Sequence, residues 1–372
     1  MRRDRNDVKD FHPAGAPTRP AQMPRPLTTG TWTMPLSDYR TVAVTGSNGF
    51  VMSVLIQRLL QQSDGPRVLC LDIFPPDEMA MKLFAPFRER LSFHTADVRD
   101  PAALKALFAE LKPEALVHGA SYTHVPAWEF TAPHPFIDVS VSGTLNVYEA
   151  LRAAGSVRKI VHVGSIASYG RPGPGTPEGL QDEDGPFYPD DYYSIGKYAG
   201  ELVARRFAEL HRIDLSVVRY SKVFGPMERP TGARKTMHVP FHLAAGVIHG
   251  RPVRVTRRTR EAVGDWINVE DAADATLAAL GGAGAPGPYN VSTGRKISVS
   301  ELITLMPAPV VWVDQGEEAD IDMDPTLRSG HYGAFSNERI GRALGWKPRQ
   351  LACQVAGYLE WAAQNPAVFD LR

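Results

Sequence analysis

The sequence is short of cysteine, of net charge and of long apolar runs. Its 372 residues include only Cys70 and Cys353, too few and too far apart for a disulfide framework or a zinc site. The 41 basic and 41 acidic side chains cancel, so no overall field favours nucleic acid or an anionic membrane. No apolar run approaches the roughly 20 residues that cross a bilayer. These absences predict a cytoplasmic protein without a metal, a nucleic-acid partner or a membrane anchor.

Residues 1–39 differ in composition from the rest of the chain. They are rich in proline, arginine and threonine and show no apolar periodicity. They also lack the apolar core of a secretory signal. We expect a disordered tail, or an over-long start if the natural chain begins at Met34. An arm that reaches a second subunit or covers the active site is the alternative.

From residue 41 onward, short apolar runs alternate with amphipathic stretches of helical period. We expect strands near 41–45, 68–71, 92–96, 115–118, 159–163 and 215–219, and helices near 53–62, 101–111, 141–154, 193–210 and 271–280. Strands that alternate with helices form a parallel sheet covered on both faces. With right-handed crossovers, the result is a doubly wound α/β (Rossmann) fold.

The first predicted strand runs into a glycine-rich turn, TGSNGFVM at residues 45–52. Glycines at this place let a backbone approach a pyrophosphate, and the following helix N-terminus supplies N–H donors. Asp72 ends the second strand about 20 residues later, where a carboxylate binds the adenosine ribose hydroxyls and repels the 2′-phosphate of NADP. The segment therefore predicts a site for NAD.

Tyr193 and Lys197 lie four residues apart in a predicted helix, and so on one face of it. An ammonium beside a phenol lowers the pKa of the phenol from its usual value of about 10. Such a tyrosine can exchange a hydroxyl proton while hydride moves to or from a nicotinamide. The pair predicts acid/base chemistry, although the spacing alone also arises by chance.

The glycine turn resembles the Thr-Gly-x-x-Gly-x-x-Gly fingerprint of extended short-chain dehydrogenases/reductases of the NAD-dependent epimerase/dehydratase type. Four further segments resemble motifs of the same family: VGSIASYG at 163–170, RYSKVFGP at 219–226, GDWINVED at 264–271 and ALGWKP at 343–348. The resemblance covers about residues 41–348. It implies that Ser165 binds the substrate oxygen, that Tyr193 is the general acid/base, and that Lys197 tunes Tyr193 and holds the nicotinamide ribose.

The resemblance also implies a set of binding residues. The cofactor contacts would be Gly46, Asn48, Gly49, Phe50, Val51, Asp72, Asp97, Val98, Gly119, Ala120, Ser121, Ser140, Tyr193, Lys197, Tyr220 and Val223. The substrate contacts would be Thr123, His124, Ser165 and Lys222, whereas His118 is expected to be structural. Residues 40–221 with about 262–282 would form the NAD-binding domain, and about 222–261 with 283–372 a smaller mixed substrate-binding region. The family commonly dimerises through a four-helix bundle, here built by residues 141–154 and 193–210.

Several positions depart from the family pattern. Met52 replaces the third glycine, so its side chain must push the helix away or point along a gap. Ser140 stands where the family has asparagine. Lys222 and Gly264 replace the asparagine and arginine that hold the nucleotide diphosphate in nucleotide-sugar epimerases. Basic residues at 254, 257, 258 and 260 either supply charge instead or form a solvated loop.

Ile166 and Ala167 follow Ser165, where sugar 4,6-dehydratases of this family have an acidic pair. Elimination is therefore disfavoured. The leading interpretation is an NAD-dependent oxidoreductase that acts on a secondary alcohol or ketone of a sugar-derived or hydroxy-acid-like molecule. An NAD-retaining epimerase of a nucleotide sugar or related polyol uses the same residues and is the alternative. A non-catalytic NAD-sensing protein is the third possibility, for which Met52 and Ser140 are the best arguments.

Overall fold

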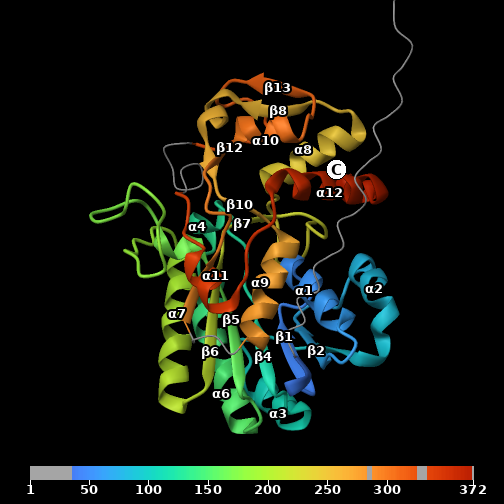
Figure 1. Cartoon of the computed structure of the whole chain (residues 1–372), viewed down its shortest axis with the longest axis vertical. Helices are drawn as coiled ribbons and strands as arrows, with labels where there is room; N and C mark the ends of the chain where they lie inside the picture. The colour runs from blue at the N-terminus through green and yellow to red at the C-terminus, as the bar shows by residue number, and fades with distance from the viewer. Residues whose placement is uncertain (1–35, 283–286, 325–332, 371–372) are drawn as a thin grey trace, which may run out of the picture. The chain divides into compact units, whose positions relative to one another are not determined.

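The computed structural model describes residues 36–282, 287–324 and 333–370. Its centre is a seven-stranded sheet in the order β11-β6-β5-β4-β1-β2-β3, in which all neighbours are parallel (Figure 1). The strands are β1 (Thr41–Thr45), β2 (Arg67–Asp72), β3 (Leu91–Thr95), β4 (Ala115–His118), β5 (Lys159–Ser165), β6 (Asp214–Tyr220) and β11 (Gly287–Val291). This order confirms the predicted doubly wound α/β fold.

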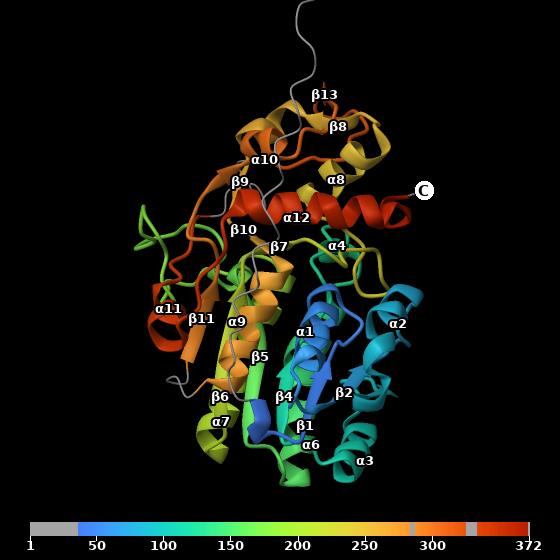
Figure 2. The ribbon, with the colours of Figure 1, turned by 45° about the vertical axis from the view of Figure 1, so that its right-hand side comes forward.

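Helices cover both faces of the sheet. On one face α1 (Phe50–Gln61) packs against α9 (Val269–Gly281), and Figure 2 shows the two helices side by side in front of the strands. On the other face lie α3 (Pro101–Leu111), α6 (Thr144–Ala154) and α7 (Tyr192–His211). Because side chains of a strand alternate between faces, Val42 and Val44 pack under α1 and Ala43 packs on the opposite side.

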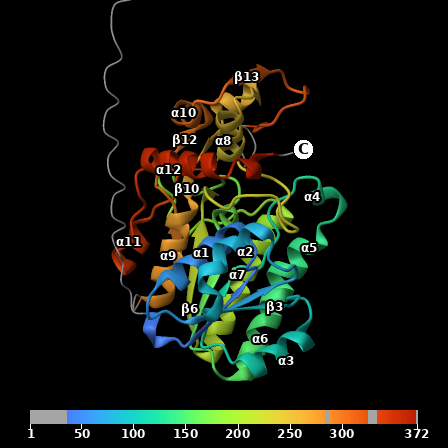
Figure 3. The same ribbon diagram turned by 90° about the vertical axis from the view of Figure 1, so that its right-hand side faces the viewer.

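A second group of elements lies beyond the carboxyl ends of the strands (Figures 1 and 3). It contains α8 (Val239–His249), β8 (Val253–Thr256), α10 (Val299–Leu305), β13 (Val310–Val313) and α12 (Leu351–Gln364). Strands β8 and β13 pair in parallel, and Phe241, Trp266 and Tyr358 belong to a separate apolar core. This group lies above the edge of the sheet where cofactors bind in such folds.

Shorter elements complete the described chain. They are α2 (Glu78–Phe84), α4 (Trp128–Thr131), α5 (His134–Ile137), a π-helical turn (Asp138–Gly143), β7 (Lys222–Phe224), β9 (Val263–Gly264), β10 (Trp266–Asn268), β12 (Ile297–Ser298) and α11 (Glu338–Leu344). Single 3-10 turns lie at Leu36–Asp38, Ala85–Arg90, Ile166–Tyr169, Arg257–Glu261 and Pro366–Phe369. Strand β7 pairs with β10, and β9 with β12. None of the helices in the described ranges has the length and apolar character needed to span a bilayer.

Of the predicted tail, residues 1–39, the first 35 residues lie outside the described part of the chain and residues 36–39 lie within it. Leu36 is buried in the main core, and the Tyr39 hydroxyl donates to the Leu280 carbonyl at 3.4 Å. The predicted division into an NAD-binding domain and a substrate-binding region stays a prediction. Within the segment assigned to the latter, β11 pairs with β6 of the main sheet.

Candidate active site

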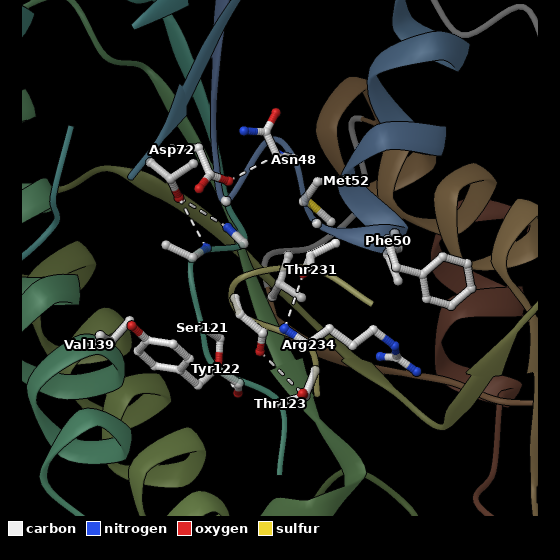
Figure 4. Close-up of a pocket in the computed structure, with 18 of the residues that line it drawn as sticks. Asn48, Phe50, Met52, Asp72, Ser121, Tyr122, Thr123, Val139, Thr231 and Arg234 are labelled. Atoms are coloured by element: carbon white, nitrogen blue, oxygen red, sulfur yellow. Dashed lines mark hydrogen bonds between the residues drawn. The ribbon is translucent and has the colours of Figure 1, made fainter. Parts of the chain in front are cut away.

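A cavity of about 810 Å³ lies at the carboxyl ends of the central strands, where the strand order reverses between β4 and β1. Its walls are the glycine turn, the ends of β2, β4 and β5, the start of α7, and the loop 230–238. Every predicted cofactor and substrate residue except Ser140 borders this cavity. Figure 4 shows part of it, with Asp72 and Asn48 on one side and Ser121, Tyr122 and Thr123 on another.

The glycine turn and Asp72 form the end of the cavity that suits adenosine. Gly46 has φ +68°, and a Cβ there would lie 2.9 Å from the backbone of Ala120. The Asp72 carboxylate accepts the backbone N–H of Asn48 at 3.0 Å and of Phe74 at 3.2 Å. Burial raises the pKa of this carboxyl, against the lowering effect of these N–H donors. Its remaining lone pairs are free for ribose hydroxyls, so the residues present fit the adenosine half of NAD.

Met52 is accommodated by a glycine on a neighbouring strand end. Its side chain is 3% exposed and packs onto Gly119, where an added Cβ would lie 2.6 Å from Sδ and 2.7 Å from Cγ. Of the two outcomes expected for Met52, the structure shows the side chain in a gap between helix and strand. The lost glycine at 52 is thus compensated by a glycine at 119.

Asp97 and Val98 follow β3 at the same edge of the cavity. Asp97 holds Arg99 through its carboxylate, with Nη2–Oδ2 at 2.7 Å, and this pairing lowers the pKa of Asp97. The Val98 carbonyl accepts the side-chain amide of Asn146 at 3.1 Å. Both residues border the cavity, and their contact with adenine stays a prediction.

The start of α7 places the tyrosine and the lysine. Asp191 caps the helix, since its carboxylate accepts the Ser194 N–H at 2.7 Å and the Ser194 hydroxyl closes the capping box. Tyr193 and Lys197 then lie one turn apart on the face toward the cavity. Gly196 lets this helix approach closely, because a Cβ there would lie 2.6 Å from the Phe136 carbonyl oxygen.

Lys197, Ser165 and Tyr193 form the predicted catalytic cluster. Lys197 is buried and donates to the Val163 carbonyl at 2.7 Å, which leaves two further N–H groups for a ligand. Burial lowers the pKa of its ammonium to about 8, against Glu201, which raises it. The Ser165 hydroxyl oxygen accepts the Ala167 N–H at 3.1 Å, so its hydrogen remains to be donated. This arrangement can orient an alcohol oxygen and exchange its proton.

A buried polar group lies behind Lys197. His118 bonds to Thr45 Oγ1 at 2.8 Å through Nδ1 and to Thr144 Oγ1 at 3.0 Å through Nε2. Burial, followed by the charge of Lys197, lowers the pKa of His118 to about 3, so the ring is neutral. Ser140 lies in the same region, away from the large cavity, and its carbonyl accepts the Thr144 hydroxyl. Its predicted contact with the cofactor stays a prediction.

Lys222, one of the predicted substrate residues, and Gly264 fit each other. The Lys222 ammonium lies 5.0 Å from the centre of the Trp266 indole. A Cβ at position 264 would lie 2.9 Å from Lys222 Cδ, so the lysine stem occupies the space in which a larger residue at 264 would begin. The two departures from the family pattern therefore depend on each other.

The other predicted substrate residues meet the loop above them. Thr123 donates its N–H and its hydroxyl to the Ala233 carbonyl at 3.4 and 3.3 Å. His124 Nε2 lies 3.6 Å from Asp191 Oδ2, and its ring lies 5.9 Å from that of Tyr193. His124 is thus held beside Tyr193.

The basic residues at 254, 257, 258 and 260 do not border the cavity. Arg254, Arg257 and Arg258 pair with carboxylates, and Arg260 lies over Trp312. The solvated-loop interpretation therefore describes them, and the charge at the cavity comes from elsewhere.

A buried ion pair joins α7 to the sheet. Arg219 of β6 bonds to both oxygens of Glu201 at 2.9 and 2.6 Å, and both side chains are fully buried. Arg219 also donates to the Tyr169 hydroxyl and the Glu183 carbonyl. Glu201 lies one turn after Lys197, so this pair fixes the rotation of the helix that carries Tyr193 and Lys197.

Sequence reasoning missed a group of residues in the loop after β7. Arg234, Thr236 and His238 border the cavity, and buried Glu228 bonds to Arg234 and to the His238 N–H. The sequence shows that basic residues are scattered through this segment. Their spacing follows neither a helical nor a strand period, so it does not indicate which of them face the cavity. Within the described ranges, no cluster of histidine, cysteine or acidic side chains could hold a metal ion.

Comparison with known proteins adds the family. The model of the NAD dependent epimerase/dehydratase family matches residues 42–292. The chain belongs to this family. It is therefore an NAD-dependent enzyme of the oxidoreductase or epimerase kind, which confirms the resemblance, the cofactor and the class of chemistry predicted from the sequence.

Individual relatives are similar over nearly the whole described chain. A UDP-glucose 4-epimerase of Mycolicibacterium smegmatis is 33% identical over 309 residues, covering 82% of this chain and 93% of the relative. The dTDP-glucose 4,6-dehydratase 1 of Escherichia coli is 24% identical over 88% of this chain and 94% of its own. The structure of a UDP-glucose 4-epimerase from Thermotoga maritima with UDP-glucose superposes with a TM-score of 0.73 at 20% identity, covering 88% of this chain and 99% of that one. At that identity the superposition shows the fold alone.

Proposed function

We propose that the protein is an NAD-retaining epimerase that inverts a secondary alcohol of a nucleotide sugar. The observation that carries the proposal is the similarity to a UDP-glucose 4-epimerase across 93% of its length. Dehydratases are also relatives, but Ile166 and Ala167 beside Ser165 are apolar, buried and at the cavity wall. They offer no acid or base for elimination, and so epimerisation without loss of water is favoured.

Each residue of the cluster has its own role in the proposed reaction. When bound, NAD takes up a hydride at its nicotinamide ring and returns it. Tyr193 accepts the proton of the sugar hydroxyl as the carbon is oxidised, and gives it back when the ketone is reduced from its other face. Ser165 donates its hydroxyl hydrogen to the same oxygen. Lys197 favours the phenolate of Tyr193 and holds the ribose with its remaining N–H groups.

Net oxidation or reduction of a sugar-derived or hydroxy-acid-like molecule is the second candidate. It is favoured by Lys222 and Gly264, which stand where the family's diphosphate-binding residues are expected. An ammonium can hold a carboxylate of a smaller substrate as well as it holds a phosphate. The two candidates differ in whether NADH accumulates.

The test is to incubate the purified protein, once without and once with added NAD, with UDP-glucose, UDP-galactose, UDP-xylose, UDP-arabinose and UDP-glucuronate in turn. Proton NMR identifies the product, and absorbance follows NADH. Formation of a 4-epimer without NADH accumulation supports the proposal. NADH formed in proportion to product, and only when NAD is added, would instead establish the dehydrogenase.

We also propose a homodimer through α6 and α7. The apolar side chains of Leu145, Ile195, Leu202 and Leu210 on these two helices are 44%, 41%, 46% and 58% exposed. Such a patch suits a second copy of the helix pair. Leu202→Glu should shift the mass measured by light scattering from dimer to monomer.

An exposed free thiol at Cys353 suits the cytoplasm, which we propose as the compartment.

A further inference from the structure

Residues 228–236, here called the strap, cross the cavity and bind to both of its sides. On the side of α2, Arg229 Nε and Nη2 bind the Asp77 carboxylate at 2.7 and 3.0 Å. On the side of β4, the Ala233 carbonyl accepts from Thr123, and the Thr236 hydroxyl donates to the His124 carbonyl at 3.1 Å. The strap therefore closes over whatever lies between the glycine turn and the end of β4.

Arg234 is the strap residue whose charge reaches this space. Its side chain borders the cavity, and the residue is only 8% exposed. One Nη bonds to Glu228 and lies 3.0 Å from His238 Nδ1. Its Nε is buried and has no hydrogen-bond partner among the described residues. A buried guanidinium N–H requires an acceptor, and none of the neighbouring side chains supplies it.

The position of the guanidinium indicates the acceptor. Its central carbon lies 5.2 Å from the ring centre of Phe50, and Figure 4 shows the side chain extending toward the side of Phe50. Phe50 is the first residue of α1, the helix whose N-terminal N–H groups face a pyrophosphate in this fold. An anion held there would lie between the glycine turn and the strap.

The charges around Arg234 are consistent with a single anionic ligand. Burial alone would raise the pKa of Glu228, but Arg234 and then His238 lower it to about 2, so Glu228 is ionised. Burial lowers the pKa of His238, against Glu228, which raises it. The charges of Arg234 and Glu228 then cancel, and Arg234 offers a ligand the N–H donor that no protein group accepts.

We propose that Arg234 is a cofactor-binding residue whose guanidinium donates to the pyrophosphate of NAD, and that the Arg229–Asp77 pair holds the strap closed over it. The inference rests on NAD binding by the family and not on the proposed epimerase reaction. The diphosphate of a nucleotide-sugar substrate is the other source of the same chemistry, and the test separates the two.

The experiment measures the release of radiolabelled NAD from the loaded full-length protein into an excess of unlabelled NAD. A second arm measures the affinity of the NAD-loaded protein for UDP by calorimetry. Arg234→Lys keeps a positive charge beside Glu228 but removes the planar N–H donor. The double variant Glu228→Gln with Arg234→Met removes both buried charges together. Arg257→Met, at an exposed ion pair away from the cavity, is the matched control.

A lost charge-assisted hydrogen bond predicts NAD release about 10- to 100-fold faster in both Arg234 variants, with UDP affinity unchanged. Asp77→Asn should also speed release, because it opens one end of the strap while leaving Arg234 in place. Unchanged NAD release in Arg234→Lys and in the double variant would overturn the proposal. A loss of UDP affinity with unchanged NAD release would assign Arg234 to the substrate diphosphate instead. Neither outcome depends on which sugar is turned over.

Discussion

A methyl group added at Gly119 should disturb the protein through Met52. The new Cβ of Gly119→Ala would lie 2.6 Å from Met52 Sδ and 2.7 Å from Cγ. Atoms of this kind sit about 3.5–4.0 Å apart at rest, so the methionine must move by roughly 1 Å. Met52 is 3% exposed between α1 and the sheet, and little free space receives it. Overpacking of this kind costs about 1–3 kcal/mol of unfolding free energy.

A double-mutant cycle measures this contact. Met52→Ala alone leaves a cavity and should cost about 2–5 kcal/mol. In Met52→Ala with Gly119→Ala, the new methyl group occupies part of that cavity. The double variant should therefore be more stable than the sum of the two changes predicts, by at least about 1 kcal/mol. Urea denaturation of the four proteins, with NAD affinity measured in parallel, gives the result.

Additive effects, within about 0.5 kcal/mol, would show that the two residues do not share the space that the structure assigns to them. Gly65→Ala is unsuitable as a control because its Cβ would meet backbone. Gly357→Ala, where an added Cβ meets nothing within 4 Å, tests instead whether any Gly-to-Ala change has this effect. It should leave the protein unchanged or slightly more stable.

Three further perturbations test other parts of the account. Glu201→Gln leaves Arg219 buried without its anion and should lower the unfolding free energy by about 3–5 kcal/mol in urea denaturation; a change under about 1 kcal/mol contradicts the role of the pair. Burial lowers the pKa of the Lys197 ammonium to about 8, so turnover should fall as the pH rises through 8 and the ammonium loses its proton. A turnover rate that stays the same up to pH 10 would show that the charge of Lys197 is not needed. Asp72→Asn should weaken NAD binding about 10- to 100-fold and reduce the preference for NAD over NADP. An unchanged preference would show that Asp72 does not contact the adenosine ribose.

The parts of the site that the sequence predicted are those set by local chain geometry. The glycine turn follows its strand directly, and Asp72 ends the next strand, which pairs beside it with Thr45 opposite Leu71. Tyr193 and Lys197 share one turn of one helix. Hydrophobic periodicity and turn chemistry are enough to place such residues together.

The parts that it did not predict depend on packing between distant segments. Nothing in the local pattern shows that Gly119 makes room for Met52, because β4 reaches β1 only through the order of the sheet. Arg234 lies in a segment without periodicity, and its direction is set by contacts at both ends of the strap. Ser140 lies in a π-helical turn and lines a small pocket together with Lys197, a position that local sequence pattern does not indicate; its contact with the cofactor stays a prediction.

The central claim is that Tyr193 moves the substrate proton while hydride passes to and from NAD. The most direct measurement compares single-turnover rates of the NAD-loaded protein and its Tyr193→Phe variant on the substrate found in the sugar panel, with bound NAD quantified in both. We expect equal NAD content in the two proteins and a rate about 10²- to 10⁴-fold lower in the variant. A rate within a few-fold of the unmodified protein would contradict it.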